Sequence, residues 1–239
     1  MTQLENLSGA LAPERVPLKG MRKMIAAKML ESLQTTAQLT HHAECRLDAL
    51  KARRAELKAA GSAVSVQDLV LLKVIETLKA HLGLNATLAD EVIHHHAAVH
   101  LGLAIPLPGD LLVAPALFNA EQLDGEELCQ ARKALVDKAL VDKALASKLS
   151  VKELTGATFT VSNLGLSRVH HFTPVLNPPQ VAILGIGGVQ RRLELSASGA
   201  LVEAEWLGLS LTFDHRAVNG APAADFLDDL CRRIEEGAA

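Results

Sequence analysis

The most informative part of the sequence runs Leu209-Ser210-Leu211-Thr212-Phe213-Asp214-His215-Arg216-Ala217-Val218-Asn219-Gly220. Its first half predicts an apolar strand, Gly220 marks a turn, and the residues that follow predict a helix. Polar groups at a strand end are where α/β proteins place their chemistry, and an imidazole held there is suited to act as a general base. The pattern fits equally well a histidine that only caps the strand, so spacing alone leaves both interpretations open.

The rest of the sequence predicts helices and strands in alternation. Helices are predicted at about 21–34, 48–60, 65–82, 124–148 and 221–235, with a helical turn at 150–156. Strands are predicted at 38–47, 91–95, 98–106, 111–117, 158–161, 180–186, 192–195 and 206–213. Ser65 and Asp68 form a capping-box pattern, and the five-residue repeat in 134–148 is too short for a solenoid. Because the sequence contains neither a G-x-G-x-x-G motif nor a P-loop, we expect one α/β domain with a mixed sheet and no nucleotide site of those kinds.

The composition narrows the class of protein. Hydrophobic residues make up 49%, charged residues 21% and aromatic residues only 3%, with no tyrosine, which predicts a core of Leu, Val, Ile and Ala. The net charge of −3 and the scarcity of aromatic stacking surfaces argue against a nucleic-acid partner. The apolar stretches fall far below the roughly 20 residues that span a bilayer, so no membrane partner is expected. Three widely spaced cysteines and no secretory signal fit a cytoplasmic protein.

Ten histidines invite a search for a metal site. Adjacent residues of a strand point to opposite faces, so the run His94-His95-His96, with His100 nearby, cannot place three ligands on one ion. The sequence therefore favours a solvated or edge-strand histidine run, and we expect no metal. The pairs His41-His42 and His170-His171 lie at predicted junctions of strand and loop, where they could line a pocket, but a structural role is favoured for them too.

Four blocks of the sequence resemble, in the same order, the acyltransferases of the 2-oxo acid dehydrogenase complexes, the dihydrolipoamide acyltransferase family. They are the segment at 17–26 (PLKGMRKMIA), the segment at 158–165 (TFTVSNLG), the segment at 177–185 (NPPQVAILG) and the Asp214-His215-Arg216 segment, which is similar to the family's D-H-R-x-x-D-G motif. The resemblance covers about residues 16–236. It implies a fold like that of chloramphenicol acetyltransferase, a two-layer α/β sandwich with a mixed β-sheet and covering helices.

The resemblance also implies three site residues and the two thiols between which the acyl group moves, those of dihydrolipoamide and coenzyme A. His215 matches the family's catalytic histidine, a general base suited to a thiol whose pKa is about 8.5 when free. Ser162 matches the serine whose hydroxyl faces the oxyanion, so no acyl-enzyme is expected. Asn219 stands where most members carry Asp, so a positioning role through its amide or as a turn former is expected. Asp214 and Arg216 are expected to hold the loop. The residues that bind coenzyme A are left unassigned.

The resemblance divides the sequence into a flexible leader at 1–16 and an acyltransferase catalytic domain at 17–236. Neither a lipoyl domain nor a subunit-binding domain is expected in this sequence. Either the sequence is a catalytic core excised from a longer protein, or it acts on a lipoyl group that another chain presents in trans. Partners are then a lipoylated protein and other components of a complex like that of pyruvate dehydrogenase. The acyl group itself is not predicted.

Family members share each active site between two subunits, which implies a homotrimer. Larger cages in the family use an apolar C-terminal tail, which the residues at 232–239 (RRIEEGAA) do not resemble, so assembly is expected to stop at the trimer. Two alternatives remain open. The chain could be a catalytically weak scaffold that organises partner enzymes, or an acetyltransferase that acts on a small-molecule alcohol.

Overall fold

A computed structural model describes residues 15–108, 111–141, 155–196 and 198–237. Its centre is a six-stranded sheet with the strand order β1-β10-β9-β8-β4-β7. These strands are β1 (Gln38–Arg46), β10 (Leu201–Asp214), β9 (Ala182–Leu195), β8 (Phe159–Asn163), β4 (Leu101–Leu103) and β7 (Ala116–Leu117). β8 runs parallel to both of its neighbours and the other pairs are antiparallel, so the sheet is mixed, as predicted.

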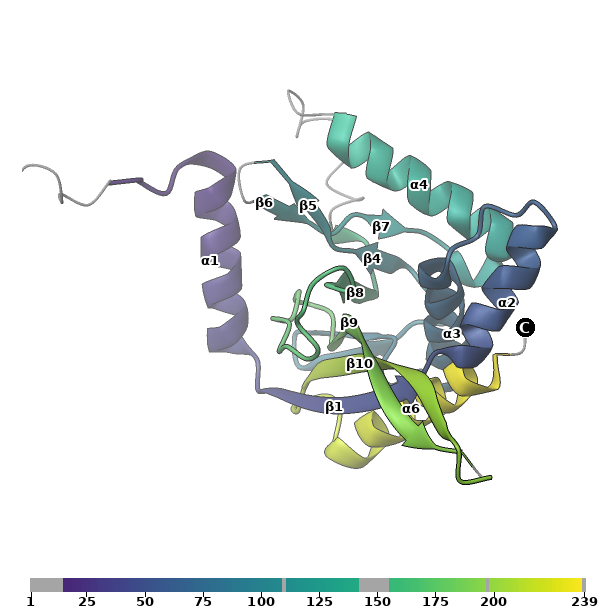
Figure 1. The fold of residues 1–239 in the computed structure, drawn as a ribbon. Helices are drawn as coiled ribbons and strands as arrows, with labels where there is room; N and C mark the ends of the chain where they lie inside the picture. The colour runs from purple at the N-terminus through teal and green to yellow at the C-terminus, as the bar shows by residue number, and fades with distance from the viewer. Residues whose placement is uncertain (1–14, 109–110, 142–154, 197, 238–239) are drawn as a thin grey trace, which may run out of the picture.

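Helices form the second layer, on one face of the sheet (Figure 1). They are α2 (Asp48–Ala59), α3 (Val66–Ala80), α4 (Gly125–Val141) and α6 (Gly220–Glu236), together with the short 3₁₀ helix η2 (Ala120–Gln122). Small hairpins flank the sheet: β2 (Ala86–Ala89) with β3 (Val92–His95), and β5 (Ile105–Leu107) with β6 (Leu111–Val113). The α/β two-layer architecture expected from the resemblance is confirmed.

The core lies between the sheet and these helices. It consists mainly of Leu, Val, Ile and Ala, with Phe159, Phe213 and Phe226 as its largest fully buried side chains. α6, the helix that follows the Asp214-His215-Arg216 segment, packs its buried side chains against β1 and β10 and is thereby fixed against the sheet.

The capping box predicted at the start of α3 is present. Asp68 N–H donates to Ser65 Oγ at 3.3 Å, and Ser65 N–H donates to Asp68 Oδ2 at 2.8 Å.

The segment at 164–181, which connects β8 to β9, crosses the opposite face of the sheet. The connection can approach the sheet closely only because glycines lie beneath it. A Cβ atom added at Gly187 would lie 1.9 Å from the carbonyl oxygen of His170, and one added at Gly208 would lie 2.1 Å from it. Farther along, the Phe172 ring lies directly over Gly185. A peptide group of the connection therefore rests where side chains of the sheet would otherwise stand.

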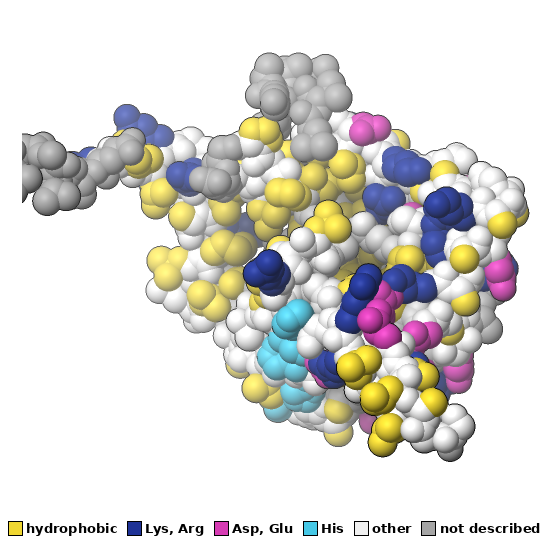
Figure 2. All heavy atoms as spheres, in the orientation of Figure 1, with side chains coloured by type: hydrophobic (Ala, Val, Ile, Leu, Met, Phe, Trp, Pro, Cys, Tyr) yellow, Lys and Arg dark blue, Asp and Glu magenta, His cyan; other side chains and the backbone are white. Residues whose placement is uncertain are grey.

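α1 (Gly20–Thr35) stands apart from the two layers (Figure 1). A space-filling view shows apolar side chains gathered over α1 and over the body of the molecule that faces it (Figure 2). Its last turn is tied to the connection, since Ser32 Oγ donates to the Leu176 carbonyl at 2.8 Å. α1 thus forms one wall of a space whose other walls belong to the sheet and the connection.

The structure differs from the sequence predictions in several elements. β9 is a single strand, whereas two strands, 180–186 and 192–195, were predicted. The prediction placed a break at Gly187 and Gly188 because glycine has a low strand propensity. In the structure these glycines lie within the strand, where they make room for the connection. The predicted strand at 98–106 divides at Ala104, whose N–H donates to the Val161 carbonyl. β2 was not predicted. The end of the predicted helix at 124–148, most of the turn at 150–156 and most of the leader at 1–16 lie outside the described residues. No described helix is long and apolar enough to cross a membrane.

Candidate active site

The loop after β10 is held by Asp214, which is almost fully buried. Its carboxylate accepts from Ala37 N–H at 3.2 Å, from Arg216 N–H at 3.1 Å and from the Arg216 guanidinium at 2.6 Å. Burial opposes ionisation of this carboxyl, but the hydrogen bonds from Arg216 and Ala37 outweigh it and leave the pKa of Asp214 below its ordinary value. Asp214 and Arg216 therefore hold the loop, as expected.

His215 and Asn219 project from this loop into solvent. The His215 backbone N–H donates to the Ala37 carbonyl at 2.8 Å, which fixes the residue, while its imidazole is exposed. Asn219 is the N-cap residue of α6, yet its side chain makes no capping hydrogen bond. Within the described part of the chain, neither side chain has a hydrogen-bond partner. Both groups are thus positioned by the backbone and free to contact a ligand or another subunit.

Ser162 lies near the end of β8 and lines a cavity of about 470 Å³. The walls are largely apolar and come from α1, β6, β8, β9 and the connection; they include Met21, Met24, Ile25, Met29, Leu112, Val113, Phe172, Pro174, Val175 and Ile183. No residue of the described ranges forms a hydrogen bond with the Ser162 hydroxyl. A hydroxyl donor in a largely apolar cavity is well placed to act on a carbonyl oxygen.

Ser162 and His215 are not brought together within one chain. Ser162 is in register with Gly185, Gly185 is in register with Ser210, and His215 follows Ser210 by five residues. At about 3.3 Å per residue and about 4.8 Å between strands, the two residues are separated by roughly 19 Å. A single chain therefore cannot present both side chains to the same reacting atom.

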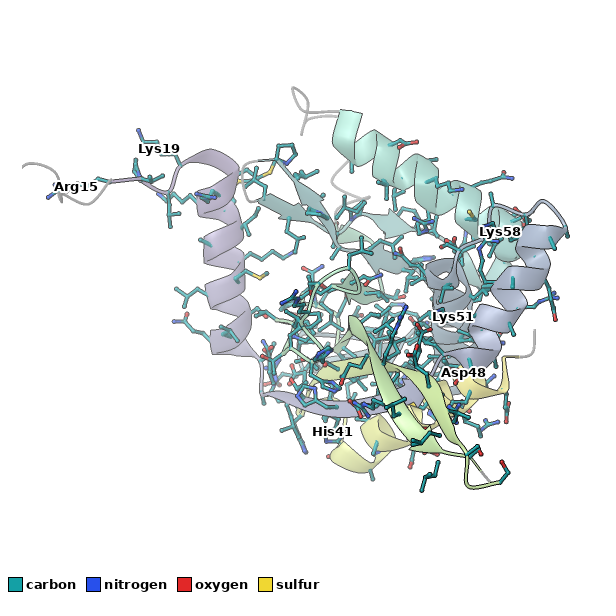
Figure 3. All side chains as sticks on the ribbon, viewed as in Figure 1. Arg15, Lys19, His41, Asp48, Lys51 and Lys58 are labelled. Atoms are coloured by element: carbon teal, nitrogen blue, oxygen red, sulfur yellow. The ribbon has the colours of Figure 1, made fainter. Side chains whose placement is uncertain are left out.

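The remaining histidines do not line the cavity of Ser162. His41, which Figure 3 labels on β1, packs edge-on against Phe213, and His42 packs against His171. His171 Nε2 contacts Glu44, whose carboxylate accepts two hydrogen bonds from Arg192. Those hydrogen bonds hold the pKa of Glu44 at about 2, because they outweigh its partial burial. These contacts fit the structural role that the sequence favours for both pairs, although His41 and His42 also line a separate cavity between β1 and α6.

The histidine run on the β2–β3 hairpin also separates into unrelated contacts. His94 is exposed, His95 contacts the Leu82 carbonyl, and His96 pairs with Thr87. His100 accepts from Asn119 N–H, 3.1 Å away. Among the described residues, no group of three or more His, Cys, Asp or Glu side chains could hold a metal ion.

Two polar residues of the cavity were missed by the sequence analysis. Lys28 and Asn177 line the same space as Ser162, although they are far apart in the sequence. A signal for Lys28 was available, because it falls within the stripe of Met21, Ile25 and Met29 at helical spacing. Asn177 was visible only as part of a family block.

The fold is that of the chloramphenicol acetyltransferase class. A solved chloramphenicol acetyltransferase superposes with a TM-score of 0.60 over 95% of this chain and 99% of that chain, at 12% identity. A model of the catalytic domain of the 2-oxoacid dehydrogenases acyltransferase family matches residues 10–239. The chain belongs to that family.

Two relatives share more of the sequence. The dihydrolipoyllysine-residue acetyltransferase component of the acetoin cleaving system of Bacillus subtilis is 39% identical over 95% of this chain and 56% of its own length. A crystal structure of Azotobacter vinelandii dihydrolipoamide acetyltransferase has a TM-score of 0.85 at 29% identity, over 96% of this chain and 94% of that chain. Its subject is the role of one serine, one histidine and one asparagine in catalysis. The chain spans about half the length of the curated relatives it matches.

Proposed function

We propose that this chain transfers an acyl group between coenzyme A and a dihydrolipoyl group, at a site composed of His215 and Asn219 of one subunit and Ser162 of a neighbour. One observation carries the proposal: within the described ranges, none of the three side chains forms a hydrogen bond, and the His215 ring contacts only Phe213. The Azotobacter relative supports it. The histidine and asparagine studied there are four positions apart, as His215 and Asn219 are, and its serine precedes the histidine by 52 positions, against 53 here.

The reaction needs only a base and an oxyanion donor. The neutral imidazole of His215 takes the proton from the attacking thiol, and the thiolate adds to the thioester carbonyl. The carbonyl oxygen becomes an oxyanion, to which the Ser162 hydroxyl donates; one such donor contributes roughly 2.7–4 kcal/mol. The intermediate then collapses, the carbon–sulfur bond of the original thioester breaks, and the leaving thiolate recovers a proton from the imidazolium of His215.

Asn219 has a separate, neutral role in this proposal. Its amide lies one turn beyond His215 on the same loop and begins α6, so it can donate to or accept from the substrate or the neighbouring subunit. No step requires a negative charge at this position. The amide therefore positions the reacting groups without taking part in proton transfer.

A neighbouring copy is needed to complete the site, and α1 supports its presence. Met21, Ile25 and Met29 face the cavity, but Leu30 and Leu33 of the same helix are more than half exposed on other sides. A helix that is apolar on opposite faces is stable in water only when both faces are covered. A three-fold ring, in which each copy lends one surface to the next, would cover α1 and join Ser162 to His215 of the adjacent copy.

The same proposal extends to partners. The acyl group would come to or from a lipoyl group presented in trans, and other components of a 2-oxo acid dehydrogenase complex in the cytoplasm would supply or consume it. The apolar cavity around Ser162 fits a small acyl chain and the pantetheine arm that leads to it.

The test is turnover of acetyl-CoA with dihydrolipoamide, followed by chromatographic measurement of the coenzyme A released. His215→Ala should lower kcat by about 10²–10⁴-fold, as expected for loss of a general base. His94→Ala is the matched control, since His94 is an exposed histidine of the β2–β3 hairpin that does not line the Ser162 cavity, and should match the parent. A parent that is inactive with every short acyl-CoA would instead support a scaffold, and turnover with hydroxyl acceptors alone would support an alcohol acetyltransferase.

A further inference from the structure

The cavity of Ser162 contains two more polar side chains without partners. Thr160, which also lines it, donates its hydroxyl proton to Gln180 at 2.6 Å and is thereby occupied. Over the described ranges, neither the Lys28 ammonium nor the Asn177 side-chain amide forms a hydrogen bond or an ion pair. Together with the Ser162 hydroxyl, three uncommitted donor groups face one largely apolar space.

Lys28 occupies an unusual position for a lysine. It is half-buried in the stripe of α1 that Met21, Ile25 and Met29 turn toward the cavity. Burial lowers the pKa of Lys28 below its ordinary value, and the Glu31 carboxylate one turn on only partly opposes this. A charged group held among apolar side chains is unfavourable until an anion pairs with it.

Asn177 is fixed close to the same part of α1. Ser32, one helical turn after Lys28, donates to the carbonyl of Leu176, the residue before Asn177. Leu176 N–H in turn donates to Gln38 Oε1 at 3.3 Å. The helix and the end of the connection are therefore tied together beside the cavity that Lys28 and Asn177 line.

We propose that Lys28 and Asn177 are further substrate-binding residues of the Ser162 cavity, in which Lys28 binds an anionic oxygen of the acyl-CoA and Asn177 binds a neutral carbonyl oxygen. The proposal rests on the proposed function for the identity of the ligand. The anionic oxygen belongs either to a phosphate of coenzyme A or to a carboxylate at the far end of the acyl group. The neutral oxygen is that of an amide in the pantetheine arm.

Calorimetric titration of the intact protein with coenzyme A, pantetheine, acetyl-CoA and succinyl-CoA tests this directly. Lys28→Met keeps the length and apolar stem of the side chain, and Lys28→Arg restores the charge. Lys23→Met is the matched control, because Lys23 lies on the same helix but is exposed and does not line the cavity. Lys23→Met should bind every ligand as the parent does.

If Lys28 binds a phosphate, Lys28→Met should weaken coenzyme A binding at least about tenfold and leave pantetheine unchanged, and Lys28→Arg should recover most of the loss. If it binds an acyl carboxylate, the loss should be confined to succinyl-CoA. Asn177→Ala should weaken pantetheine about three- to tenfold. Equal loss for all four ligands, or no loss for any, would overturn the role of Lys28; unchanged pantetheine binding by Asn177→Ala would overturn that of Asn177.

The titration separates this inference from the proposed function. A parent that binds coenzyme A but does not transfer the acyl group overturns the proposed function alone. A parent that transfers the acyl group while Lys28→Met binds all four ligands normally overturns the inference alone. A parent that binds none of them overturns both.

Discussion

Gly187→Ala should disturb the cavity of Ser162 through the connection that crosses the sheet. A Cβ atom at Gly187 would lie 1.9 Å from the His170 carbonyl oxygen, and contacts become ordinary only at 3.4 Å, so this carbonyl must retreat by about 1.5 Å. The neighbouring backbone is held by the hydrogen bond from Gly188 N–H to the Val169 carbonyl, at 2.7 Å. Phe172, two residues beyond His170, lines the cavity and must move with it.

The expected cost combines overpacking, about 1–3 kcal/mol, with weakening of one backbone hydrogen bond, about 1 kcal/mol, for a total of about 2–4 kcal/mol. Urea unfolding at a fixed protein concentration should show a midpoint lower by roughly 1 M at an m-value near 3 kcal/mol/M. The KM for acetyl-CoA should rise as well. Gly83→Ala is the control, because no atom lies within 4 Å of a Cβ at that position. The packing argument is wrong if Gly187→Ala matches Gly83→Ala in both midpoint and KM.

Three further predictions concern the loop and the oxyanion donor. Ser162→Ala should lower kcat about 10²–10³-fold with little change in KM, and a change confined to KM would refute the oxyanion role. Asn219→Asp should cost on the order of 1 kcal/mol, or about fivefold in kcat/KM, whereas a loss as large as that of His215→Ala would show that the amide is essential. Asp214→Asn should destabilise the protein by about 2–3 kcal/mol at pH 7 by weakening its contacts with Arg216 and Ala37. Because the folded-state pKa of Asp214 is lowered, this contribution is present above the ordinary carboxyl pKa and disappears as the pH falls through the folded value, so unfolding midpoints of parent and variant should converge in acid.

Local signals in the sequence were sufficient for most helices and for the strand that ends at Asp214. The capping box at Ser65 and Asp68 marked the beginning of α3 because both of its hydrogen bonds form within four residues. The apolar run into Asp214 and His215 likewise identified β10 and the loop after it. Such features form between residues that are close in the sequence, so they can be predicted from the local sequence alone.

Features that depend on distant contacts were not predictable in the same way. Gly187 and Gly188 suggested a break in the strand, and only the passage of the His170 carbonyl above them explains why β9 continues. Lys28 and Asn177 meet at one cavity because a side chain of α1 bonds to the connection, a contact that neither local pattern contains. The pairing of Ser162 with His215 that we propose is even less visible in the sequence, since it needs a second copy of the chain.

Mixed trimers test the shared site most directly. Ser162→Ala and His215→Ala subunits carrying two different affinity tags are co-expressed, and particles that carry both tags are purified and assayed with acetyl-CoA and dihydrolipoamide. In a three-fold ring each mixed trimer contains one junction with an intact His215 facing an intact Ser162, so the doubly tagged particles should have about one third of the parent activity per trimer. Doubly tagged particles no more active than either variant alone would contradict a site shared between subunits.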